Sequence, residues 1–79
     1  MKRVSVTWID AIGGGDDWIS LEDLKKEKPH IHYSMGFLAH ETEECITISM
    51  SYDAEEQNMG GWLCIPRPYI VKIEELVLQ

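Results

Sequence analysis

The stretch LCIPRPYIVKIEEL, residues 63–76, decides the fold. Pro66 and Pro68 interrupt its apolar run, and neither has the backbone N–H that a central strand must donate. We therefore predict that one strand ends near Ile65 and that PRPY forms a tight, helix-like turn. A short apolar run also fits a helical period, with Ile70, Ile73 and Leu76 on one side. We favour a closing strand over 70–76, because β-branched residues crowd it and the preceding strands leave an edge to cover.

Alternation of apolar and polar residues predicts four strands upstream, over 3–10, 31–40, 45–53 and 60–65. The apolar sets that share a face are Val4, Val6 and Trp8; then Ile31, Tyr33, Met35, Phe37 and Ala39; then Ile46, Ile48, Met50 and Tyr52. The last set is predicted to point inward, with Cys45, Thr47, Ser49 and Ser51 outward. Trp8, Phe37 and Tyr52 are the expected aromatic core.

The segment between the first two strands is predicted to hold a loop and one short helix. DAIGGGDD, residues 10–17, is too rich in glycine and aspartate for regular structure. Ser20 is placed to cap a helix with Asp23 three positions later, and Pro29 ends it. So short a helix is marginal alone, so its apolar side, Leu21 and Leu24, is expected to dock on the sheet.

Together these elements predict one domain over residues 1–79, a mostly β fold with one short helix or turn after the first strand. Curling five strands into a small barrel would remove the sheet edges. Gly36 and the pair Gly60–Gly61 lie where sharp strand bends are needed.

The segments GFLAHETEECITISMSYD and GGWLCIPRPYIVKIEEL follow the strand order of a small SH3-like barrel, and resemble its Sm-like variety over residues 30–76. That resemblance implies a five-stranded SH3-like barrel and, by analogy, a ring that binds RNA. With VTWIDA near the start, the whole chain also resembles small uncharacterised proteins of tailed bacteriophages. This likeness implies a phage or prophage product acting in the host cell cytoplasm.

Charge and cysteine usage limit the partners and the compartment. The chain carries 14 acidic and 7 basic residues, for a formal charge of −7, which repels phosphate backbones and makes nucleic acid an unlikely partner. Two cysteines, Cys45 and Cys64, do not make a disulfide scaffold or a zinc ribbon. No stretch resembles a signal peptide or reaches membrane-spanning length, so we expect a cytoplasmic protein without a membrane partner.

A histidine row is the first candidate site. His30 and His32 project from one face of a strand, and His40 is expected to join them. Such a row suits a transition metal, but no recognised spacing fixes a third and fourth ligand. We favour a solvent-facing polar row and predict no metal.

The other candidates lie on loops and turns. Asp16, Asp17 and Trp18 form a possible contact loop, since functional residues concentrate on loops. Trp18 and Trp62 adjoin glycines and loops, so we expect them to be partly exposed, which favours an oligomer interface over core packing or stacking on a ligand. Arg67, held between two prolines, is placed to meet an anion or carboxylate.

No catalytic motif is present, so we predict a non-enzymatic protein without a cofactor. The favoured function is a phage-encoded interaction module that self-associates and binds a host protein. One alternative is a small-ligand binder that sequesters a nucleotide signal in pockets between subunits. A second alternative is an Sm-like ring that binds RNA.

Overall fold

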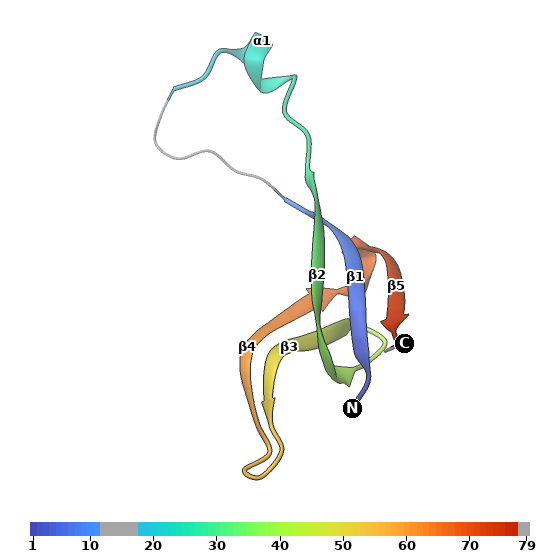
Figure 1. The fold of residues 1–79 in the computed structure, drawn as a ribbon. Helices are drawn as coiled ribbons and strands as arrows, with labels where there is room; N and C mark the ends of the chain where they lie inside the picture. The colour runs from blue at the N-terminus through green and yellow to red at the C-terminus, as the bar shows by residue number, and fades with distance from the viewer. Residues whose placement is uncertain (12–17, 78–79) are drawn as a thin grey trace.

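The computed structural model describes residues 1–11 and 18–77. Its strands form one antiparallel sheet in the order β4-β3-β2-β1-β5 (Figure 1). The elements, in chain order, are β1 (Arg3–Asp10), α1 (Leu21–Leu24), β2 (His30–Glu41), β3 (Cys45–Asp53), β4 (Asn58–Pro66), the 3-10 turn η1 (Arg67–Tyr69) and β5 (Ile70–Leu76). The predicted mostly β fold with five strands is confirmed. No helix in the described part of the chain is long and apolar enough to cross a membrane.

The proline corner is built as predicted. β4 ends at Pro66, the backbone makes one 3-10 turn, and β5 begins at Ile70. β5 pairs antiparallel with β1, with Ile73 opposite Val6, so the last apolar run is a strand and not a helix. The sheet nevertheless stays open, because β4 and β5 are its two edges and share no ladder. The predicted closure into a barrel is therefore wrong.

The core lies inside a curled sheet. Its buried hydrophobic residues are Val4, Val6, Trp8, Ile46, Ile48 and Ile65, with Leu38 and Ile70 packed against them. β1 is not adjacent to β3 or β4 in the sheet, so its inner face meets them only because the sheet curls, and Figure 1 shows them crossing behind β1 and β2. The indole N–H of Trp8 donates to Ser34 Oγ at 3.0 Å, which satisfies the polar end of this core side chain.

The alternation predicted along β3 holds only for its first half. Ile46 and Ile48 are buried, but Ser49 is also fully buried, and Met50 is 76% exposed. The predictions that Met50 points inward and Ser49 outward are therefore wrong. The cause is Gly36 of β2: a Cβ there would lie 2.6 Å from the carbonyl oxygen of Ser49, so the missing side chain lets the two backbones approach. Ser49 Oγ lies 2.8 Å from each of two backbone carbonyls, Ser51 O and Gly60 O, within donating distance of both.

Two predicted core aromatics lie at the margin of the core. Phe37 and Tyr52 are only half-buried and pack on each other, with ring centroids 6.3 Å apart. Phe37 lies opposite Arg3, on the face of β2 that points away from the core. Tyr52 lies in the second half of β3, where the alternation of buried residues has ended.

The helix forms as predicted but does not dock. Ser20 Oγ accepts a hydrogen bond from the backbone N–H of Asp23 at 3.1 Å, which caps α1. Leu21 and Leu24 are 66% and 51% exposed, and α1 stands away from the sheet in Figure 1. The docking prediction is wrong because β1 and β2 stay paired to Asp10 and His30, so the connecting chain leaves beyond the end of the sheet. We call residues 18–29 the arm.

Candidate functional site

The most prominent surface feature is an apolar row on the side of β1 and β2 that faces away from the core. Pairing sets Ile9 opposite Ile31, Thr7 opposite Tyr33 and Ser5 opposite Met35. We define the outer stripe as Ile9, Ile31, Tyr33, Met35 and Leu76. Ile31, Tyr33 and Met35 are 58%, 75% and 67% exposed, so their predicted common face is exposed to solvent.

The polar surroundings of the outer stripe resemble the rim of an interface. Its cross-strand neighbours on β1 are the small residues Ser5 and Thr7, and beyond them on β5 lie Glu74 and Lys72. Lys72 and Glu74 form an ion pair at 3.2 Å. An apolar centre bordered by charged residues is the usual anatomy of a protein interface, where Tyr and Met are enriched.

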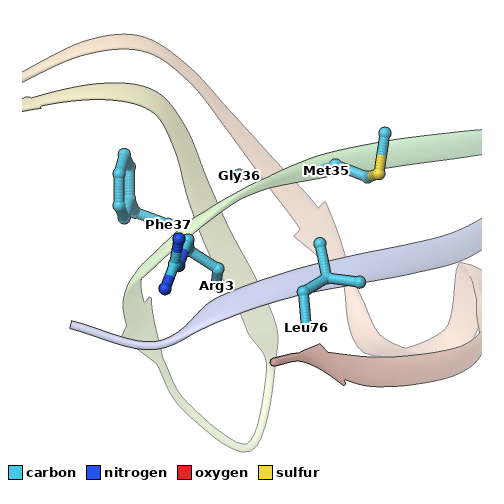
Figure 2. Close-up of a pocket in the computed structure, with 5 residues that line it drawn as sticks. All are labelled: Arg3, Met35, Gly36, Phe37 and Leu76. Carbon is cyan, nitrogen blue, oxygen red and sulfur yellow. The ribbon is translucent and has the colours of Figure 1, made fainter. Parts of the chain in front are cut away.

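One end of the outer face is hollowed. A cavity of about 210 Å³ is lined by Arg3, Met35, Gly36, Phe37 and Leu76 (Figure 2). Figure 2 shows Arg3 beside Phe37 on one side, and Met35 and Leu76 on the other. A second hollow of about 340 Å³ adjoins it, shares Arg3 and Leu76, and adds Lys2 and Glu75 to the charged residues at the rim. The outer face therefore ends in a mainly apolar cavity with cations at its rim.

The predicted histidine row is divided between the two faces of β2. His32 lies on the inner face, with its ring centroid 4.9 Å from that of Trp8 and its Nε2 3.6 Å from Asp10 Oδ2. A register shift between Leu38 and His40 sets His40 opposite Thr47, so His40 is on the opposite face from His32. The prediction that His40 joins the row is wrong, because the bulge interrupts the alternation. Among residues 1–11 and 18–77, no group of three or more potential ligands is placed to hold a metal ion.

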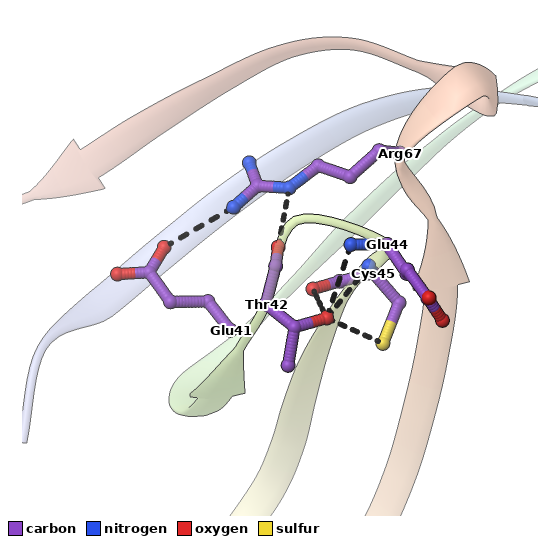
Figure 3. A network of polar contacts seen from close by, with 5 residues as sticks. All are labelled: Glu41, Thr42, Glu44, Cys45 and Arg67. Atoms are coloured by element: carbon purple, nitrogen blue, oxygen red, sulfur yellow. Dashed lines mark hydrogen bonds and ion pairs between the residues drawn. The ribbon is translucent and has the colours of Figure 1, made fainter.

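Arg67 is engaged within its own chain (Figure 3). Its Nε donates to the carbonyl oxygen of Thr42 at 3.0 Å, and its Nη2 lies 3.6 Å from Glu41 Oε2. Its backbone N–H donates to the carbonyl oxygen of Glu44 at 2.8 Å. Thr42 Oγ1 in turn accepts from the backbone N–H groups of Glu44 and Cys45, both at 3.1 Å. Arg67 thus ties η1 to the β2–β3 loop, and the carboxylate that it meets belongs to the same molecule.

The two predicted exposed tryptophans are confirmed as exposed, and they lie on different elements. Trp18, on the arm, is 101% exposed, and Trp62, on β4 opposite Ser49, is 68% exposed. Asp16 and Asp17 lie outside the described residues. No hydrogen bond or ion pair within the described ranges joins Trp18, Trp62, Arg67 or the histidines to one another, so these candidates do not form one site.

Cys64 is an accessible thiol with altered acidity. Side-chain hydrogen bonds with Thr47 and Cys45 favour its thiolate and lower its pKa from the ordinary value. Cys64 is exposed, and Thr47 is its cross-strand partner.

Since the thiolate is the nucleophile, we expect Cys64 to react with iodoacetamide faster at pH 7 than an unperturbed thiol. A Cys45→Ser background leaves Cys64 as the single thiol and keeps a hydroxyl beside it. In that background, Thr47→Val should move the midpoint of the rate against pH upward, since it removes the first of the two hydrogen bonds. Identical midpoints with and without the Thr47→Val substitution would contradict the assigned cause.

The outer stripe is the feature that reasoning from the sequence missed. Alternation placed Ile31, Tyr33 and Met35 on one face but did not say that this face is uncovered. The opposite face of β2 is the covered one, because His32 and Ser34 contact Trp8, a residue distant in the chain.

Comparison with known proteins adds no assignment: no protein-family model, no curated protein and no solved structure matches the chain.

Proposed function

We propose that this chain is a non-enzymatic interaction module that self-associates through the outer stripe and binds a second protein. The observation that carries the proposal is the exposed apolar stripe, with Tyr33 at its centre. Its exposure contrasts with a core of only six buried hydrophobic residues among those described.

The total surface supports the same proposal. The accessible surface is 6628 Å², about 1,700 Å² more than the roughly 4,900 Å² expected of a compact monomer of 9.1 kDa. The radius of gyration is 16.2 Å, against about 12 Å for a compact domain of this length. A standard interface buries about 800 Å² of each partner, so the excess is large enough to supply one.

The second partner follows from charge and from the resemblance to phage-encoded proteins. The formal charge of −7 suits a protein with a basic surface, because complementary potentials steer association. We propose that this partner is a host protein.

The proposal is tested by the solution mass of the purified protein. Light scattering and native mass spectrometry should report a dimer or larger at micromolar concentration. Tyr33→Glu should weaken association about 30-fold or more, because it buries a charge at the centre of the interface. The matched control is Met50→Glu, since Met50 is equally exposed (76%) but lies on β3 away from the stripe. A wild-type monomer at about 100 μM, well above the range in which a specific interface associates, or equal masses for both variants, would overturn the proposal.

A further inference from the structure

The arm carries apolar side chains that its own chain leaves uncovered. Trp18 is 101% exposed, Ile19 49%, Leu21 66% and Leu24 51%, and no residue of α1 is buried. A helix of four residues has little stability by itself and normally depends on tertiary packing. The arm is therefore a segment that lacks its packing surface.

The cavity at the end of the outer face has the size and lining for an aromatic side chain. An apolar cavity of about 150 Å³ holds benzene, so one of about 210 Å³ is large enough for much of an indole ring. Arg3 at its rim can stack on an aromatic face, and Met35 offers a thioether to a ring edge. Gly36 contributes only backbone atoms to the lining, because a Cβ there would point to the other face of β2, toward the backbone of Ser49.

Charge matches the arm to this end of the sheet. Glu22 and Asp23 lie in the first turn of α1, four and five positions after Trp18, and Asp23 Oδ1 lies 3.7 Å from Lys26 Nζ of the same arm. Lys2 and Arg3 line the two adjoining hollows. Glu75 also lines the second hollow, so an arm seated with Trp18 in the cavity brings Glu22 to a rim where two cations outnumber one carboxylate.

Two-fold symmetry places the point where the arm joins β2 in one copy opposite the cavity of another. The arm joins β2 at His30 and the cavity surrounds Gly36, so Tyr33 lies midway along a span of about 20 Å. Consider two outer faces stacked on each other, with a two-fold axis between them that crosses β2 at Tyr33. The strands then run antiparallel, and the His30 end of each copy lies opposite the Gly36 end of its partner. Such an isologous contact is the commonest arrangement of a homodimer.

From these observations we infer that the cavity of Arg3, Met35, Gly36, Phe37 and Leu76 receives Trp18 from the arm of a second copy. The self-associated form is then a face-to-face dimer with two reciprocal arm contacts. This inference rests on the proposed self-association. It adds which side chain occupies the cavity and how the two copies are arranged.

The test uses one variant of the arm and one of the cavity. Trp18→Ala removes the inserted side chain, and Leu76→Glu places a charge in the cavity wall; both positions are exposed enough for the fold to be retained. Each homodimer then lacks both arm contacts, and its dissociation constant, measured by sedimentation, should rise about 1,000-fold, or about 30-fold per contact. An equimolar mixture restores one wild-type arm facing one wild-type cavity, so the heterodimer should form with only about a 30-fold loss.

Controls keep the outcomes distinct. Trp62→Ala removes an exposed tryptophan that lies on β4 and should leave association unchanged. Circular dichroism checks the fold, and Arg3→Glu serves as a second cavity variant if Leu76→Glu does not fold. If the wild type dimerises and Tyr33→Glu separates it, but Trp18→Ala does not weaken it, the arm contact is overturned and the proposed function stands. If both variants associate weakly and the equimolar mixture does not restore association, the cavity is not the receptor. A monomeric wild-type protein overturns both proposals. This holds also for a monomer in which Trp18 is shielded from a fluorescence quencher by packing on its own sheet.

Discussion

Gly36→Ala is expected to lower the free energy of unfolding by about 3 kcal/mol, the upper end of the range for overpacking in a core. The added Cβ would lie 2.6 Å from the carbonyl oxygen of Ser49 and 3.1 Å from its carbonyl carbon. A backbone group cannot rotate away, so β2 and β3 must separate. For a chain of 79 residues the total stability is on the order of 4–12 kcal/mol, so this loss is a large share of it.

Urea unfolding followed by tryptophan fluorescence measures the loss, because unfolding exposes the buried Trp8, whereas Trp18 and Trp62 are already exposed. Gly60→Ala is the matched control, because a Cβ there meets only Ser51 Cβ at 3.8 Å, an ordinary contact. It should change stability by no more than about 0.5 kcal/mol. Equal midpoints for the two variants would contradict the close approach of β2 and β3.

Ile46→Ala is expected to cost about 2–5 kcal/mol, whereas Met50→Ala should cost about 0.5 kcal/mol or less. The alternation along β3 assigns both residues to the core. In the structure Ile46 is 1% exposed and faces Ile65, but Met50 is 76% exposed. The first change therefore leaves a cavity in the core, and the second removes side-chain atoms that are already in water.

Differential scanning calorimetry or urea unfolding of the two variants separates these cases. Since both substitutions remove a large apolar side chain, the difference between their losses of unfolding free energy reports the effect of burial. A similar loss for both would mean that β3 keeps strict alternation through Met50 and does not bend at Ser49.

The candidate surface shows why part of the site was beyond sequence reasoning. Alternation along β2 separates Ile31, Tyr33 and Met35 from His32 and Ser34, and the apolar set is the natural choice for the core. The structure reverses that choice, because Trp8 lies opposite His32 and its indole N–H bonds to Ser34. Which face of β2 is turned to the core depends on its pairing with β1, a strand that is distant in the chain.

The exposure of Trp18 and Trp62 was predictable, because glycines and loops beside them give no packing surface. The cavity at the end of the outer face was not, since Arg3, Met35 and Leu76 come from three strands. Neither was the position of the arm, which depends on how far β1 and β2 stay paired.

By itself the sequence determined the local elements: the five strands, the capped turn of helix after Ser20 and the 3-10 corner between Pro66 and Ile70. These follow from restricted backbone angles, missing N–H donors and period-two alternation, all of which act between near neighbours. Tertiary structure alone decided which face of β2 is covered, where β3 bends and that the sheet stays open. Those outcomes depend on contacts between distant segments, such as that of Gly36 with Ser49. The free energy of such contacts cannot be inferred from a local sequence pattern.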